Sequence, residues 1–83
     1  MFYKVKSVEP QGNYNLLVIF ENNIQKIYDV SLLFDKYLTF NQLQTIKGLI
    51  EQVKVDIGGF GISWNDEIDI SCNELWNNGI LIN

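Results

Sequence analysis

Residues 53–70 have the sequence VKVDIGGFGISWNDEIDI, and this stretch decides the fold of the chain. Apolar and polar residues alternate over 53–57, which predicts a strand, and the glycines within 58–61 break that strand with a loop. A second strand follows, then the acidic turn 65–67, and then a third short strand of Ile-Asp-Ile. We therefore expect a small C-terminal hairpin, with which the rest of the chain shares its core.

The N-terminal third predicts an antiparallel meander, because runs of strand-forming residues alternate with turn-forming ones. The expected strands cover 2–9, 14–20 and 24–29. The middle run, YNLLVIF, has apolar residues on both faces, which favours a central strand covered on both sides. The turn at Asn22 and Asn23 suits a tight hairpin, and it sets Ile27 opposite Val18.

Between these two groups of strands, the spacing of apolar residues changes to that of a helix. Residues 30–38 predict a short helical or 3-10 turn capped by Ser31. A longer helix is expected over 46–52, with Thr45 as its N-cap. After the hairpin, a last helix is expected over 72–77.

Capping signals and an apolar tail mark the C-terminal end. Ser71 and Glu74 have the spacing of a capping box at the start of the last helix, and Gly79 stops that helix. The apolar tail 79–83 carries Ile80, Leu81 and Ile82. We expect these three side chains either to extend a sheet of their own chain or to dock on another chain, as a partner contact or a homodimer.

Together these elements predict an α+β fold: an antiparallel β-meander with short helices packed on one face, and a small C-terminal hairpin closed by a helix. A chain of 83 residues is expected to form a single domain over 1–83 with one modest core. The in-phase apolar positions form the expected core: Leu16, Val18, Phe20, Ile27, Leu49 and Trp64.

Composition narrows the function classes. The net charge is −4 and the chain has no arginine, which argues against nucleic-acid binding. It has no histidine, the commonest general base and metal ligand, so we expect neither an enzyme nor a cofactor. The single Cys72 allows no internal disulfide, which fits the cytoplasm. No stretch has the pattern of a signal peptide or a membrane span.

The excess negative charge lies in the last third of the chain. Residues 55–83 hold five carboxylates and no lysine. Asp66, Glu67 and Asp69 form the sharpest cluster, and we expect them to be solvated turn charges, with a contact for a basic protein partner or a metal site as the alternatives.

Three other features have a structural interpretation and a functional alternative. The glycine-rich loop 58–61 could cradle a phosphate, but it lacks the Walker lysine and leads into a strand, which favours a plain turn. Cys72 is expected to be a small buried residue. Trp64 and Trp76 are expected to serve the core, with a partner surface as the alternative.

The order of several short motifs resembles a small bacterial family known as domain of unknown function 2442. The matching motifs are Phe-Glu-Asn at 20–22, Tyr-Asp-Val at 28–30, Trp-Asn at 64–65, Asp-Ile at 69–70 and Leu-Trp at 75–76. The resemblance covers residues 2 to 76. The chain departs from the family pattern where Asn23 replaces a turn glycine, where the proline after Trp64 is missing, and in the tail from Asn77.

The resemblance implies an α+β fold that also occurs ahead of helix-turn-helix domains. Members of this family are often encoded beside another small protein, in arrangements like toxin–antitoxin pairs, and the resemblance implies the same for this protein. It carries over no catalytic residue. We therefore expect a non-enzymatic protein-interaction module, an antitoxin-like or regulatory partner of a neighbouring small protein. The alternative is an acidic phage or mobile-element inhibitor that blocks a nucleic-acid-binding site on its target.

Overall fold

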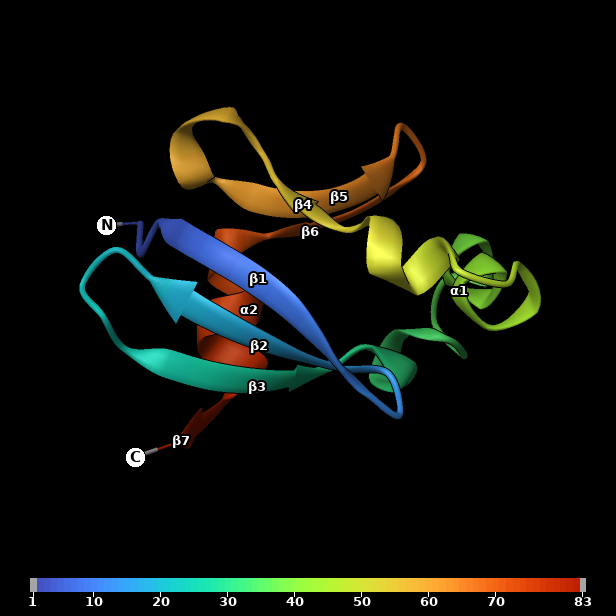
Figure 1. The fold of residues 1–83 in the computed structure, drawn as a ribbon, viewed down its shortest axis with the longest axis horizontal. Coiled ribbons are helices and arrows are strands. Elements are labelled where there is room, and N and C mark those ends of the chain that lie inside the picture. Colours follow the sequence, from blue (N-terminus) through green and yellow to red (C-terminus); the bar gives the residue numbers. More distant parts are fainter. Residues whose placement is uncertain (1, 83) are drawn as a thin grey trace.

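The computed structural model describes residues 2–82 and contains two antiparallel sheets that share one core (Figure 1). The first sheet has the strand order β1-β2-β3-β7, and the second has the order β4-β5-β6. The strands of the first sheet are β1 (Val5–Gly12), β2 (Asn15–Phe20), β3 (Gln25–Asp29) and β7 (Ile80–Ile82). The strands of the second are β4 (Lys54–Val55), β5 (Gly61–Asn65) and β6 (Ile68–Ser71).

Short helical segments join these strands. The α-helices are α1 (Gln42–Thr45) and α2 (Cys72–Asn78). The 3-10 turns cover Val30–Leu33, Leu38–Asn41, Leu49–Gln52 and Ile57–Gly59. In Figure 1, α2 lies behind the first sheet, and it contacts β3, β5 and β6. The predicted α+β fold is confirmed.

The hairpin between β2 and β3 has a different register from the one expected. Ile27 lies opposite Leu17, and Val18 lies opposite Lys26. The loop has three residues, 21–23, and its last residue, Asn23, has the left-handed φ of 68°. The prediction assumed a two-residue turn, so the pairing of Ile27 with Val18 was wrong by one residue.

The first sheet is covered on one face only, which corrects a second expectation. Leu16, Val18 and Phe20 point to the inner face of β2 and are fully buried. Leu17 and Ile19 point to the opposite face and are only half-buried. Helix α2 packs on the inner face. Within residues 2–82, no helix or strand covers the outer face (Figure 1).

The core confirms most of the predicted residues. Four of them are buried: Leu16, Val18, Phe20 and Trp64. Leu49 is half-buried and packs against the core. Ile27 was wrongly placed there, because the shifted register brings Tyr28 into the core in its place. Cys72 is buried, as expected.

The segment between the sheets is less helical than predicted. The expected helix over 46–52 does not form, because Ile46 is extended and Gly48 has a left-handed φ of 81°. The expected capping role of Ser31 is also wrong. Asp29 is the N-cap of the first 3-10 turn, and its carboxylate accepts hydrogen bonds from the Ser31 backbone N–H and hydroxyl.

Gly59 joins the two sheets by close approach. It has a φ of +78°, and a Cβ at this position would lie 2.7 Å from the backbone oxygen of Val5. Only glycine combines this conformation with this proximity. The glycine-rich loop is therefore a packing turn against β1, and β1 also contacts β4.

The ends of α2 lie where the sequence predicts. The Ser71 side chain accepts a hydrogen bond from the Glu74 backbone N–H at 3.1 Å. Gly79 ends the helix by donating its N–H to the Leu75 carbonyl. Its φ is −71°, so glycine is needed here for space: a Cβ would lie 2.5 Å from the Leu75 oxygen.

Candidate functional site

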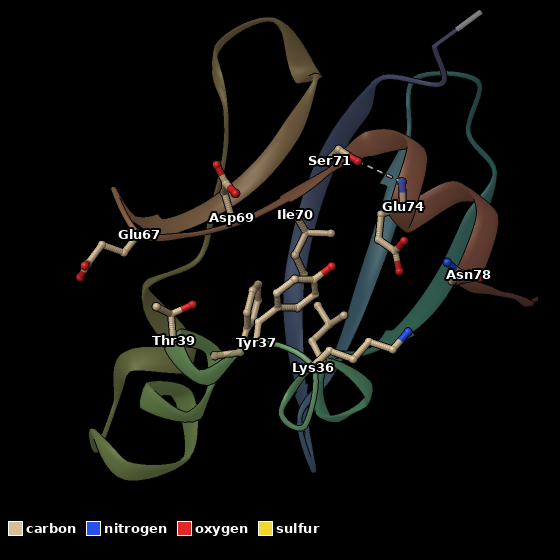
Figure 2. A pocket seen from close by; sticks show the side chains of 11 residues that line it. Lys36, Tyr37, Thr39, Glu67, Asp69, Ile70, Ser71, Glu74 and Asn78 are labelled. Atoms are coloured by element: carbon tan, nitrogen blue, oxygen red, sulfur yellow. Dashed lines mark hydrogen bonds between the residues drawn. The ribbon is translucent and has the colours of Figure 1, made fainter.

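One hollow in the surface is a groove with a volume of about 490 Å³, which we call the acidic groove (Figure 2). Its walls come from the 3-10 segment that follows β3, from β6 with the turn before it, and from α2. Its lining residues are Leu33, Lys36, Tyr37, Thr39, Phe40, Glu67, Asp69, Ile70, Ser71, Glu74 and Asn78.

Strand alternation explains how β6 contributes to this groove. Ile68 and Ile70 are buried, while Asp69 between them is exposed. Glu67 precedes the strand by one residue and lies in the turn between β5 and β6. Both acids border the groove, with side chains that point away from Tyr37 in Figure 2, whereas the third predicted acid, Asp66, is not among the lining residues.

Glu74 supplies a third carboxylate from a different element. The buried Tyr28 donates its hydroxyl hydrogen bond to the Glu74 carboxylate at 2.7 Å. Burial raises the pKa of Tyr28 above its ordinary value, and the hydrogen bond to Glu74 raises it further. The hydroxyl therefore stays protonated, and it fixes Glu74 at one end of the groove.

The wall across the groove from β6 presents an aromatic ring and a cation. Tyr37 is 55% exposed, and its ring stands in the middle of the groove in Figure 2. The side chain of Lys36 extends along the same wall toward the side of Glu74 and Asn78 (Figure 2). Among the lining residues, three are acids and Lys36 is the one cation.

Sequence reasoning found part of this groove. Glu67 and Asp69 were predicted as partner-binding residues and lie together in it. Glu74 was interpreted only as a capping residue, and the hydrogen bond from Tyr28 depends on a contact between residues 46 positions apart. Lys36 and Tyr37 carried no signal, because only the packing of distant elements brings them opposite the acids.

The possible metal site and the two tryptophans were the other functional alternatives that the sequence left open. Within residues 2–82, no group of three or more histidine, cysteine or acidic side chains has the geometry to hold a metal ion. Trp64 is buried, and its ring N–H donates to the Ile50 carbonyl. Trp76 is half-buried and stacks on Tyr3 with ring centroids 3.8 Å apart. In the part of the chain that the structure describes, no helix is long and apolar enough to cross a membrane.

A second surface lies on the uncovered side of the first sheet. Cross-strand pairing aligns Leu17 with Ile27 and Ile27 with Ile80. The neighbouring row contains Ile19 and Ile82 on either side of Gln25. We call these five aliphatic side chains the outer face: Leu17, Ile19, Ile27, Ile80 and Ile82.

Strand β7 settles the position of the apolar tail. It pairs with β3 of its own chain, which is one of the two outcomes expected for Ile80, Leu81 and Ile82. In doing so it becomes the edge of the first sheet. Its side chains remain 71%, 55% and 38% exposed, respectively.

The chain folds into a small α+β domain, in which α2 contacts both antiparallel sheets and β7 pairs with β3. The chain belongs to the family described as protein of unknown function DUF2442, whose model matches residues 5–80. The match includes both walls of the groove and the first residue of β7. Searches of curated proteins and of solved structures each gave no match to this chain.

Proposed function

We propose that this protein is a non-enzymatic protein-interaction module, an antitoxin-like or regulatory partner of a small protein encoded beside it. The observation that carries the proposal is the outer face together with the unpaired edge of β7. These surfaces are aliphatic and accessible, and contiguous exposed apolar surface marks interaction sites in soluble proteins.

Strand β7 has the properties of a docking edge. Proteins protect exposed edge strands with charged residues, prolines or bulges. The sequence of β7, Ile-Leu-Ile, contains neither a charge nor a proline. A partner strand can therefore pair with its free backbone groups while contacting the outer face with its side chains.

Charge supports the choice of a protein partner with a basic surface. The five carboxylates within residues 55–83 are not offset by any lysine in that part of the sequence. A negative potential speeds the encounter with a basic protein and repels DNA and RNA. The single buried thiol of Cys72 is compatible with the reducing cytoplasm, where we place the protein.

An acidic inhibitor from a phage or mobile element is the second candidate. The acidic groove favours it, because carboxylates on a folded surface can occupy a site that otherwise binds nucleic-acid phosphates. Gene context separates the two candidates: a small toxin-like neighbour supports the first, and a block of phage genes supports the second.

Co-expression with the proteins encoded on either side tests the proposal. We expect one of them to form a complex of defined mass, measured by size-exclusion chromatography with light scattering. Ile80→Lys with Ile82→Lys should abolish the complex by placing charges on the docking edge. Leu32→Lys is the matched control, since Leu32 is a 58% exposed aliphatic residue outside the outer face. No complex with either neighbour, or equal loss with the control, contradicts the proposal.

A further inference from the structure

We propose that Asn78 is a site of spontaneous deamidation, and that its conversion to isoaspartate detaches β7 from β3. The proposal starts from the place of the Asn78–Gly79 pair, between the last turn of α2 and the first residue of β7 (Figure 2). It names a chemical modification of the chain and goes beyond the proposed function. Its consequence for partner binding is the one part that rests on that function.

The reaction requires a backbone nitrogen that reaches the side-chain amide of the residue before it. Asn78 is the one asparagine of the sequence that a glycine follows, and a residue without a Cβ leaves the approach of its nitrogen unhindered. The Gly79 nitrogen attacks Cγ of Asn78, a C–N bond forms, and the side-chain nitrogen leaves as ammonia with the Gly79 amide proton. Water then opens the five-membered imide at either carbonyl, which gives aspartate or isoaspartate.

The fold itself requires the glycine that makes Asn78 reactive. A Cβ on Gly79 would lie 2.5 Å from the Leu75 backbone oxygen and 3.0 Å from the Cβ of Lys26. These distances exclude a larger residue unless the end of α2 moves. Asn78 is exposed, so water has access to its side chain. The packing at the end of α2 therefore keeps a reactive pair at the surface.

In the closed helix, hydrogen bonds keep the reacting groups apart. The Gly79 N–H donates to the Leu75 carbonyl at 2.9 Å, so this nitrogen is engaged in the last turn of α2 and not with Asn78. The Lys26 ammonium donates to the Trp76 carbonyl and lies 4.0 Å from the centroid of the Trp76 ring. Deamidation therefore needs the last turn to open, and Lys26 resists that opening.

The last turn of α2 can open while the core stays closed. Asn77 and Asn78 are both exposed. No residue from 77 to 82 belongs to the core or to the half-buried hydrophobic side chains packed against it. Helix ends fray, and segments with few buried contacts open at a small cost in free energy. We therefore expect the folded chain to deamidate at a rate set by this local opening.

Isoaspartate changes the length of the backbone just before β7. The chain then runs through Cβ and Cγ of residue 78, which adds one methylene between α2 and β7. The three residues of β7 pair with Gln25–Ile27, starting at the first residue after Gly79. A strand this short has no further residues with which to recover its register, so the added length should break the pairing. On the proposed function, this modification removes the docking edge.

Mass spectrometry of the purified full chain, incubated at mildly alkaline pH, locates the reaction. Residues 55–83 contain no lysine or arginine, so trypsin releases them as one peptide after Lys54. Replacement of an amide by a carboxyl group raises the mass of that peptide by about 1 Da. We expect fragmentation to place the change at Asn78. Asn73 and Asn77, in the same peptide, are internal controls that should stay unmodified.

A substitution in β3 tests the role of the structure. Lys26→Met keeps an unbranched side chain beside Trp76 but removes the ammonium. It should raise the deamidation rate about fivefold, as expected when local opening no longer breaks a hydrogen bond. Lys47→Met is the matched control, because Lys47 is an exposed lysine in the segment between the sheets. The wild type in a denaturing concentration of urea gives the upper limit of the rate.

NMR spectra of the isotope-labelled chain test the release of β7. The isoaspartate form, separated by ion exchange, should lose the amide signals that residues 25–27 and 80–82 have in the paired state. Asn78→Asp carries the new charge on a backbone of normal length, so it should keep these signals. This variant separates the effect of chain length from the effect of charge.

The inference is overturned if Asn78 of the folded chain stays unmodified while the chain in urea converts, or if Lys26→Met converts no faster than Lys47→Met. An isoaspartate form with unchanged β7 signals overturns the detachment of β7. These measurements use the isolated chain, so failure to find a partner leaves them intact. Conversely, an isoaspartate form that releases β7 and still binds the neighbouring protein contradicts the docking edge and leaves this inference standing.

Discussion

At the scale of single residues, Tyr28 joins the two halves of the molecule. It lies on β3, is fully buried, and donates its hydroxyl to Glu74 on α2 at 2.7 Å. The hydrogen bond therefore couples the first sheet to the helix that also contacts the second sheet. The same contact sets the position of a carboxylate that borders the acidic groove.

Tyr28→Phe should lower the free energy of unfolding by about 1–2 kcal/mol at neutral pH, because it removes a hydrogen bond to a charged acceptor. The raised pKa of Tyr28 means that the folded state keeps a proton that the unfolded chain loses above about pH 10. Stability from this group is therefore present below about pH 10 and falls as the pH rises further.

Urea denaturation at pH 7 and at pH 10.5 measures both effects. The wild type should lose stability between these pH values, and Tyr28→Phe should lose less. Tyr37→Phe is the control, since Tyr37 is an exposed tyrosine. An equal loss in all three proteins would mean that Tyr28 does not titrate as described.

Val18 and Leu17 test the one-sided covering of β2. Val18 is 0% exposed, so Val18→Ala should cost about 1–3 kcal/mol through lost burial and a cavity. Leu17 is half-buried on the outer face, and Leu17→Ala should cost less although it removes more atoms. Denaturant midpoints compare the two variants. The reverse order would place the core on the other face of the sheet.

At the scale of elements, two turns need a glycine for different reasons. The turn at Gly12 needs it for its backbone angle alone, and the turn at Gly59 needs it also for space. Gly12 and Gly59 both have positive φ, +89° and +78°. A Cβ on Gly12 meets nothing within 4 Å, whereas a Cβ on Gly59 meets the Val5 oxygen at 2.7 Å. The turn at Gly59 is thus a point where the second sheet packs closely against β1.

Gly12→Ala should cost about 1 kcal/mol, the price of a left-handed backbone for a residue with a side chain. Gly59→Ala should cost clearly more, because the backbone of β1 must also move. Thermal unfolding of both variants gives the comparison. Similar melting temperatures would show that β1 and the turn before β5 are not in close contact.

The free edge of β7 leads to a prediction about association. A three-residue strand pair buries far less than the roughly 1,200 Å² of a standard interface, so a homodimer formed only there must be weak. We expect a monomer–dimer equilibrium at high micromolar protein, measured by sedimentation equilibrium. Ile80→Thr with Ile82→Thr keeps β-branched residues and should remain monomeric. Identical monomeric behaviour of both proteins would leave a partner strand as the occupant.

At the scale of the whole molecule, the distribution of charge sets which partners can approach. We expect no measurable binding to labelled duplex DNA or single-stranded RNA near physiological salt, by fluorescence anisotropy.

A basic protein partner should associate faster at low salt than at high salt. Reversing Asp66, Glu67 and Asp69 to lysine should slow that association far more than it changes folding. An unchanged rate with no salt dependence would show that these acids are only solvated turn charges.

Across the whole molecule, local sequence patterns predicted some features of the structure and missed others. Local patterns located most strands, the cap of α2 at Ser71 and the burial of Trp64, because these depend on neighbours in sequence. The register of Ile27 failed because the expected two-residue turn needs a positive φ at both Asn22 and Asn23, and only Asn23 has one. The acidic groove needed distant elements to meet, and no local pattern records that.

Pairing of β7 with β3 has a consequence for how the chain is made. The two strands are separated in sequence by residues 30–79, while β2 and β3 form a local hairpin that closes early. On the ribosome, the far edge of β3 therefore stays unpaired until residues 80–82 emerge. In a crowded refolding mixture, the β7 of another chain can occupy that edge first, which exchanges the strand between molecules. Slow dilution, which keeps chains apart until β7 has closed on its own β3, is thus the condition that favours correct assembly.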